Sequence, residues 1–331
     1  MLKTLVFFHF YEANETYLKN LLHFLYFGYS KDAHYVIIIT DKCSVDLPSL
    51  DNVTYINVQN GNWDYGGYCQ AIATVKDVLD YDYIFFVNCS VRGPFSPPYL
   101  KTSWFEIFTD LMVDNVGLVG ATINKVTPAS ALFGVFTKRY ACDSADHVQT
   151  PVYAMSKDVF HYLFSHGFYN IQGILTRDQV VEDYEALLSK LVSDRGWRVK
   201  CLLPEFEITN KGPLSKIADR TSHNGDVIGP KRYFGRTPHP YETMFVKTNR
   251  ALFTDDYLDR LAHSMYWAGV GSKRYFGFQS YYIDDLIKIS KMDKEIEMIT
   301  PRRTRIKKLE NSIKKRLKRI SESKYLLAFK K

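Results

Sequence analysis

Residues 81–94 read Tyr-Asp-Tyr-Ile-Phe-Phe-Val-Asn-Cys-Ser-Val-Arg-Gly-Pro, and of all segments this one is the most informative about the fold. Residues 83–87 are aromatic or β-branched without a polar interruption, which predicts a strand buried on both faces of a sheet. Asn88, Cys89 and Ser90 therefore lie at the carboxyl end of that strand, the edge at which open α/β sheets bind ligands. A second interpretation stays open, because Asn-x-Ser followed by Gly-Pro also fits a simple turn.

A second polar loop follows another predicted strand, residues 53–58 (VTYINV). The loop reads Gln59-Asn-Gly-Asn-Trp-Asp-Tyr-Gly-Gly67 and leads into a helix expected near 67–79. Its glycines let the backbone approach a ligand closely, and Asp64 offers a carboxylate that suits a ribose or a base. Two strand ends in succession thus carry polar side chains, which favours a ligand site at this edge of the sheet.

Strands and helices alternate along the first part of the chain. Strands are expected over 3–9, 34–39, 53–58, 83–87 and 116–122, and helices near 14–27, 67–79 and 102–112. This alternation predicts an α/β fold with a mainly parallel sheet flanked by helices and joined by right-handed crossovers.

Together with four later motifs, the two loops resemble glycosyltransferases of the GT-A type. The resemblance is to a branch that carries Asn-Ser-Ser-x-Arg-Gly-Pro at the sheet edge where better-known members carry Asp-x-Asp. The matching segments span roughly residues 3–250 and are Asn62-Trp-Asp-Tyr-Gly66, Asn88-Cys-Ser-Val-Arg-Gly-Pro94, Val119-Gly-Ala-Thr-Ile-Asn124, His147-Val-Gln149, Tyr184-Glu185 with Ser189, and His239-Pro-Tyr-Glu-Thr-Met-Phe-Val-Lys247. The resemblance implies a GT-A-like (Rossmann-like) sheet and a transferase whose donor is a nucleoside-diphosphate sugar.

The resemblance also implies roles for individual residues. It makes Glu185 the first choice for the catalytic base of an inverting transfer, with Asp183 second. It places the nucleotide sugar against a set of polar side chains, which are Asn62, Asp64, Asn88, Ser90, Arg92, His147, Gln149, His239 and Lys247. A buried, hydrogen-bonded histidine is the other interpretation of His147. The segment 124–146 is expected to be a mobile loop over the site.

Periodicity gives an independent view of the acidic segment after Thr176. Val181, Tyr184, Leu188, Leu191 and Val192 form the predicted buried stripe of a helix. Glu182, Glu185 and Ser189 then lie on the adjoining face, at steps of three and four. Acidic residues in the first turns of a helix also offset its dipole, which is the structural interpretation of Asp178 and Glu182.

Residues 88–90 leave metal dependence open. Asn88, Cys89 and Ser90 offer an amide oxygen, a soft sulfur and a hydroxyl, a poor cage for Mg²⁺ or Mn²⁺. Either Arg92, Lys247 or His239 neutralises the diphosphate without a metal, or Asn88 holds a metal weakly through water.

The net charge of +7 comes from the last 31 residues, which hold 13 Lys or Arg against two Glu and leave −4 on the first 300. The main body is therefore not a nucleic-acid binder. In the tail, Ile306, Leu309, Ile313, Leu317 and Ile320 follow helical spacing among basic residues. This pattern predicts a helix on an anionic membrane surface, with a coiled coil or a solvated helix as alternatives. The expected regions are thus a transferase domain over 1–250, a helical extension over 251–300 and a membrane-associating tail over 301–331.

Location and acceptor follow from these features. No segment reaches the roughly 18 apolar residues of a membrane span, no cleavage site follows the short apolar start, and the five cysteines are scattered. We expect a cytoplasmic enzyme, peripheral on a membrane, acting on a glycan or lipid-linked glycan in surface-polysaccharide (capsule or O-antigen type) synthesis. A nucleotidyltransferase and a non-catalytic membrane scaffold remain alternatives, although residues 9–15 lack the glycine-rich basic loop usual in the former.

Overall fold

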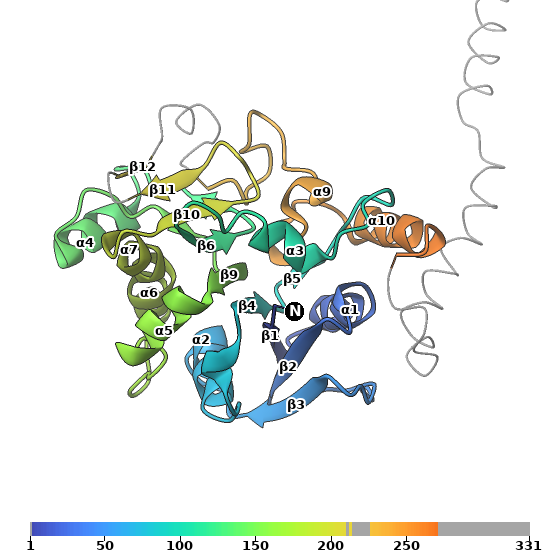
Figure 1. Ribbon diagram of the computed structural model, residues 1–331. Helices are drawn as coiled ribbons and strands as arrows, with labels where there is room; N and C mark the ends of the chain where they lie inside the picture. Colours follow the sequence, from blue (N-terminus) through green and yellow to red (C-terminus); the bar gives the residue numbers. More distant parts are fainter. Residues whose placement is uncertain (1, 210–211, 214–225, 271–331) are drawn as a thin grey trace, which may run out of the picture. The chain divides into compact units, whose positions relative to one another are not determined.

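A nine-stranded sheet forms the centre of the computed structural model, in the order β12-β11-β10-β6-β9-β4-β1-β2-β3 (Figure 1). The structure describes residues 2–209, 212–213 and 226–270. The expected tail helix at 301–331 lies outside these residues, and the three expected regions stay predictions. The strands of the sheet are β1 (Thr4–Tyr11), β2 (Ala33–Thr40), β3 (Val53–Val58), β4 (Tyr83–Asn88), β6 (Val116–Gly120), β9 (Val152–Ser156), β10 (Arg198–Cys201), β11 (Glu207–Thr209) and β12 (Gly212–Pro213).

Most of these strands run in one direction. β1 pairs in parallel with both β2 and β4, β2 with β3, and β6 with β10. β9 runs antiparallel between β4 and β6, so those two strands point the same way, and β11 is also antiparallel to its neighbours. The predicted α/β fold with a mainly parallel sheet flanked by helices is therefore confirmed.

The central strand β4 is buried on both faces, as its sequence predicts. Ile84 and Phe86 pack into the core on one side of the sheet, and Phe85 and Val87 into the core on the other. α2, α5 and α7 cover the first side, and α1 and α3 cover the second (Figure 1). Because side chains alternate along a strand, a run without polar residues is what a sheet between two helical layers requires.

The helices of the described residues are mostly short. The α-helices are α1 (Glu15–His23), α2 (Trp63–Ile72), α3 (Trp104–Thr109), α4 (Ala131–Tyr140), α5 (Lys157–Ser165), α6 (Arg177–Val180), α7 (Leu187–Asp194), α9 (Pro240–Thr243) and α10 (Asp255–Trp267). Segments of π- or 3₁₀-helix are η1 (Phe24–Gly28), η2 (Val78–Asp80), η3 (Val181–Ala186) and η4 (Thr248–Arg250). Within the described ranges, no helix combines the length and the apolar composition that crossing a bilayer requires.

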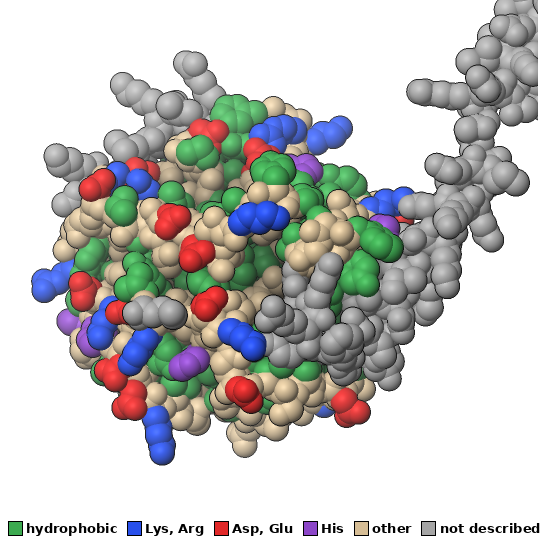
Figure 2. Space-filling view, turned by 45° about the vertical axis from the view of Figure 1, so that its right-hand side comes forward, with side chains coloured by type: hydrophobic (Ala, Val, Ile, Leu, Met, Phe, Trp, Pro, Cys, Tyr) green, Lys and Arg blue, Asp and Glu red, His purple; other side chains and the backbone are tan. Residues whose placement is uncertain are grey.

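Two small sheets connect distant parts of the chain. β5 (Val91–Arg92) pairs antiparallel with β13 (Val246–Lys247), and β7 (Ile123–Asn124) pairs with β8 (His147–Val148). The first pair brings residues near 247 beside the turn that follows β4. The surface in Figure 2 shows acidic and basic side chains interspersed, so this face presents charges of both signs.

Helix α2 begins at Trp63, four residues before the expected start. Asn62 and Trp63 both adopt the left-handed backbone conformation, with φ of 58° and 54°. Glycine is required next, because a side chain at Gly66 would collide with the carbonyl oxygen of Gly61, and one at Gly67 with the ring of His9. The two glycines thus allow close packing of the helix, and Asp64 lies in its first turn.

Candidate functional site

A cavity of about 820 Å³ lies at the carboxyl ends of β1, β2 and β4, where Tyr11, Thr40 and Asn88 line it. Most of the side chains expected at the site line this same cavity, namely Asn62, Asp64, Asn88, Ser90, His147, Gln149, Glu185 and Lys247. Its position is the one that the strand ends predict for a ligand in an open α/β sheet. Its size lies within the ~300–1,000 Å³ usual for small-molecule sites.

The two polar loops meet through a chain of hydrogen bonds. Asn88 Nδ2 donates to Asp64 Oδ2 at 2.8 Å, which joins the end of β4 to the first turn of α2. Asn88 Oδ1 accepts from the backbone N–H of Ser90 at 3.1 Å and also from the Ser90 hydroxyl. The turn at 88–90 is thus both a local turn and part of the cavity wall, so the two interpretations of the sequence are compatible.

Lys247 reaches the cavity because β13 is fastened to the turn after β4. Lys247 pairs with Val91 in the β5–β13 ladder. The backbone N–H and the hydroxyl of Thr248 both donate to the carbonyl oxygen of Ser90, at 2.9 and 3.1 Å. A cation from late in the chain is therefore held beside the Asn88 edge.

Glu185 lies in the π-helical segment η3 and lines the cavity. Burial and the nearby negative charge of Asp64 raise the pKa of its carboxyl to about 7, against the opposing effects of Lys247 and a hydrogen bond from Thr150. The pKa of Lys247 shifts downward. Burial lowers it, and the nearby negative charges of Glu185 and Asp64 oppose that shift. The two carboxylates and the amine therefore form one electrostatic group. A carboxyl with a raised pKa, such as that of Glu185, is typical of catalytic sites.

The wider turns of η3 separate residues that a regular helix would place together. Glu182 pairs with Arg139 at 3.2 Å and does not line the cavity, whereas Glu185 does. Ser189 is buried and its hydroxyl accepts from the backbone N–H of Val148 at 2.9 Å. Of these three residues, Glu185 alone lines the cavity, and residues 181–186 depart from the α-helical period on which the prediction of a shared face depends.

His147 and Gln149 have defined partners. His147 is buried, its Nδ1 donates to the carbonyl oxygen of Ala145 at 2.7 Å, and burial lowers its pKa. The ring is therefore neutral near pH 7, with Nε2 as the acceptor. Gln149 Oε1 accepts from Thr122 at 2.8 Å, and its Nε2 donates to Asp226 at 3.0 Å. Both side chains are thus oriented by the protein before any ligand arrives.

Asn62 holds a neighbouring loop in place. Its Nδ2 donates to the carbonyl oxygen of Gly173, and its Oδ1 accepts from the backbone N–H of Leu175, each at 2.8 Å. The next residue, Trp63, is 48% exposed and lines the cavity. A bulky residue with positive φ is uncommon, and such strain gathers at functional sites.

Three of the expected residues lie elsewhere. Arg92 is fully buried and donates to Asn20 Oδ1 at 3.0 Å, Asp259 at 2.8 Å and Asp255 at 3.2 Å. His239 caps α9, where Nδ1 accepts from Tyr241 N–H at 3.1 Å, and its Nε2 lies 3.1 Å from the Tyr257 hydroxyl. Neither the side chain of Arg92 nor that of His239 lines the cavity.

Asp183 is the third expected residue that does not line the cavity. It pairs with Arg139 at 3.0 Å and accepts a hydrogen bond from the Tyr140 hydroxyl. These bonds fasten α4 to η3. The segment expected as a loop at 124–146 therefore contains a helix, and its Asn124 and Leu132 line the cavity.

The cavity also includes side chains that the sequence analysis does not predict. They are His9, Trp63, Thr150, Arg177, Asp226 and Arg250. Trp63 belongs to the loop motif at 62–66, and that motif is the signal that indicates its position. Arg177 opens the acidic helical segment, but Asp226 and Arg250 follow no pattern in the sequence that distinguishes them from surface residues.

Asn88 does not fit the role of a metal ligand. Its carbonyl oxygen already accepts two hydrogen bonds from Ser90, and its amide nitrogen donates to Asp64. Cys89 is buried, and burial raises the pKa of its thiol to about 12, so no thiolate is offered. Over 2–209 and 226–270, no three His, Cys, Asp or Glu side chains are grouped closely enough to hold a metal ion.

The solved structures similar to this chain include two that show how distant the similarity is. No known family model and no curated protein matches the sequence. A mannosyltransferase from Pyrobaculum calidifontis, solved with GDP-mannose and Mn²⁺, is 11% identical, with a TM-score of 0.37 over 91% of this chain and 82% of that one. A 4-diphosphocytidyl-2C-methyl-D-erythritol synthase from Anaerococcus prevotii is 10% identical, with a TM-score of 0.34 over 60% of this chain and 87% of that one. At these TM-scores neither similarity indicates a function, which we therefore infer from the residues of the cavity.

Proposed function

We propose that this protein is a glycosyltransferase that moves a sugar from a nucleoside diphosphate to the hydroxyl group of an acceptor. The observation that carries the proposal is the meeting of Asp64, Asn88, Glu185 and Lys247 around one cavity at the strand ends. An activated sugar needs a cation for its diphosphate, a carboxylate for its ribose and a base for the incoming hydroxyl, and these side chains supply all three.

Glu185 is the proposed base. With a pKa of about 7, its carboxylate is substantially ionised near neutral pH and still basic enough to accept a proton. As the acceptor oxygen bonds to the anomeric carbon, its proton passes to Glu185. The bond between that carbon and the diphosphate breaks, and its electron pair leaves with the diphosphate. Attack from the face opposite the leaving group inverts the anomeric centre.

The diphosphate is proposed to lie against Lys247, with Arg177 and Arg250 at the same cavity. Charge-assisted hydrogen bonds from ammonium and guanidinium groups to phosphate oxygens are among the strongest in proteins. These three cations can balance the charge that develops on the leaving group. Since Asn88 is already committed to Ser90 and Asp64, no step of this proposal passes through a metal ion.

The nucleoside is proposed to lie between Asp64 and Trp63. Asp64 Oδ2 accepts from Asn88, which leaves its second oxygen for a ribose hydroxyl. The exposed indole of Trp63 offers a flat apolar face next to it. Stacking of a base on an aromatic side chain contributes about 1–3 kcal/mol and tolerates any base.

For the acceptor, we propose a glycan or lipid-linked glycan used in surface-polysaccharide (capsule or O-antigen type) synthesis at the cytoplasmic face of a membrane. The support is the basic amphipathic pattern of residues 301–331. The full chain should float with vesicles that contain anionic lipid, and Ile313→Glu with Leu317→Glu should prevent this. Equal flotation of both proteins would contradict membrane attachment by the tail.

The direct test mixes the full chain with UDP-, GDP- and dTDP-sugars and measures thermal stability and products. A glycosyltransferase is stabilised by its donor and slowly releases nucleoside diphosphate and free sugar. A nucleotidyltransferase would instead release pyrophosphate from a nucleoside triphosphate and a sugar phosphate. A chain that no nucleotide sugar stabilises, and that hydrolyses none, would contradict the proposal and favour a scaffold.

A further inference from the structure

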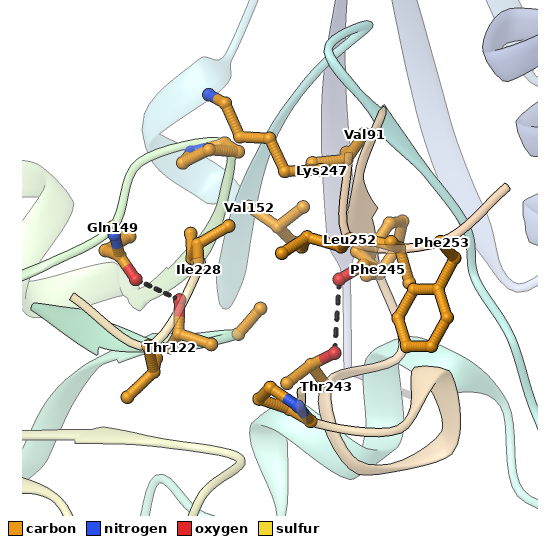
Figure 3. Close-up of a pocket in the computed structure, with 15 residues that line it drawn as sticks. Val91, Thr122, Gln149, Val152, Ile228, Thr243, Phe245, Lys247, Leu252 and Phe253 are labelled. Atoms are coloured by element: carbon orange, nitrogen blue, oxygen red, sulfur yellow. Dashed lines mark hydrogen bonds between the residues drawn. The ribbon is translucent and has the colours of Figure 1, made fainter. Parts of the chain in front are cut away.

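A second, much smaller recess lies beside the catalytic cavity, with a volume of about 30 Å³. Gln149, Pro151, Ile228 and Lys247 line both spaces. In Figure 3 the Lys247 side chain lies along the rim, and its amino end points away from the apolar side chains of the recess. The recess therefore adjoins Lys247, against which the proposed function puts the diphosphate that carries the transferred sugar.

The walls of the recess are apolar. Val91, Val152, Ile228, Phe245, Leu252 and Phe253 surround it, and the methylene groups of Lys247 complete the rim (Figure 3). They come from β5, β9, the segment that contains Ile228 and the residues that flank β13, so the recess forms only when distant parts of the chain assemble. It is a feature of the folded site rather than of one local segment.

The polar side chains at the recess are already bonded to the protein. The Thr122 hydroxyl donates to Gln149 Oε1 at 2.8 Å, and Gln149 Nε2 donates to Asp226. The Thr243 hydroxyl donates to the carbonyl oxygen of Phe245 at 3.2 Å. Figure 3 shows the first and the last of these bonds. A buried water needs two to four polar partners, so the recess favours an apolar group over water.

The volume of the recess limits the size of the chemical group that can bind in it. A space must offer about 10–15 Å³ to hold one water-sized group, so this recess holds about two or three such groups. It is too small for a sugar ring, a nucleobase or a lipid chain. A methyl group fits, whereas a hydroxyl in the same place would lose its hydrogen bonds to water and gain none.

We propose that the recess receives a methyl substituent of the sugar substrate, such as the methyl of a 6-deoxyhexose or of an N-acetyl group. This inference depends on the proposed glycosyltransferase function, and it narrows the substrate class to methyl-bearing sugars. The methyl group belongs either to the transferred sugar or to the acceptor sugar, and the two arms of the experiment distinguish these sources.

The experiment uses the full chain and matched substrates that differ at one methyl group. The donor arm compares a 6-deoxyhexose nucleotide with its parent hexose nucleotide, and an N-acetyl with an N-formyl hexosamine nucleotide. The acceptor arm makes the same comparisons with soluble glycosides. Each arm is measured for wild type, for Ala121→Val and Val152→Ile, which add methyl groups to the recess, and for Ala268→Val, a matched change at an exposed position. Melting temperatures verify that each variant is folded.

Wild type is expected to prefer the methyl-bearing member of at least one pair by about 10- to 200-fold in kcat/KM, the range for one such group in an apolar pocket. Ala121→Val or Val152→Ile should reduce that preference to within about twofold, with Ala268→Val unchanged. Turnover of nucleotide sugars without a preference in any pair would overturn the inference and leave the proposed function standing. An equal loss on both members in the two filled variants would also overturn it.

Discussion

Asp64 and Asn88 are joined by a hydrogen bond of 2.8 Å, although Asp64 follows β3, Asn88 ends β4, and the two lie 24 positions apart. The bond connects the first turn of α2 to the end of β4 and so fixes the relative position of the two polar loops. Glu185 lines the same cavity from the later half of the chain, and its pKa responds to the charge of Asp64. This convergence is what makes a transfer reaction at this edge of the sheet chemically reasonable.

Replacing Glu185 should abolish transfer without abolishing nucleotide binding. Glu185→Gln keeps the shape of the side chain but cannot accept a proton, so kcat should fall by about 10²- to 10⁴-fold. Calorimetry should still detect the nucleoside diphosphate. Glu182→Gln is the matched control, because Glu182 pairs with Arg139 outside the cavity, and its kcat should stay within a few-fold of wild type. Near-normal turnover in Glu185→Gln would remove Glu185 from the mechanism.

The activity should depend on pH through the same carboxyl. Because the ionised form is the base, kcat should rise as pH increases through about 7 and level off above it. A kcat profile that is flat between pH 5.5 and 8.5 would show that another group is the base.

The contribution of Glu185 to the stability of the folded protein should fall as pH rises, whereas the activity should rise. The folded state favours the protonated form of Glu185, so the stabilisation present at low pH is lost as pH rises from the ordinary carboxyl range through about 7. Glu185→Gln cannot ionise and should escape this loss. Its melting temperature relative to wild type should therefore increase between pH 5 and pH 8. A constant difference across that interval would mean that the carboxyl is not perturbed in the folded protein.

Removing the amine of Lys247 should weaken the binding of the nucleoside diphosphate and also raise the pKa of Glu185. A charge-assisted hydrogen bond contributes about 1.5–3 kcal/mol, so Lys247→Met should raise the Kd for the nucleoside diphosphate by roughly 10- to 100-fold. Because Lys247 also lowers the pKa of Glu185, the midpoint of the kcat profile should move above 7. Lys76→Met changes an exposed lysine outside the cavity and should do neither. A Kd that is the same in Lys247→Met and Lys76→Met would exclude Lys247 from the diphosphate site.

Arg92 is expected to stabilise the folded protein rather than to bind the nucleotide. Removing one partner of a buried ion pair costs about 3–5 kcal/mol. Asp259→Ala, which leaves the buried Arg92 without its 2.8 Å partner, should therefore strongly lower the free energy of unfolding measured in urea. Asp256→Ala, in an exposed i,i+4 pair with Arg260, should cost less than about 1 kcal/mol. Similar losses in the two variants would contradict the structural role of Arg92.

The sequence predicts the sheet well because its evidence is local. The uninterrupted apolar run at 83–87 can only be satisfied between two helical layers, and the polar residues after it must then lie at a strand end. The start of α2 is harder, since Asn62, Gly66 and Gly67 are typical of a loop. Only the packing of Gly67 against His9 shows why a helix contains them.

Two of the predicted site residues lie outside the cavity for a common physical reason. Arg92 and Asp183 carry charges suited to a nucleotide sugar, but each is neutralised by a partner far away in the sequence, Asp259 and Arg139. Pairings at such separations leave no periodic signal. The π-helical turns at 181–186 likewise shift Glu185 relative to Glu182, and a prediction based on 3.6 residues per turn cannot include that shift.

A crystal structure of Glu185→Gln with a nucleoside-diphosphate sugar that stabilises the protein would test whether sugar transfer takes place in this cavity. We expect the diphosphate within hydrogen-bond distance of Lys247, the ribose at Asp64, and the anomeric carbon facing residue 185 across space for an acceptor hydroxyl. A nucleotide bound outside the cavity, or inside it with the anomeric carbon turned away from residue 185, would contradict the proposed function.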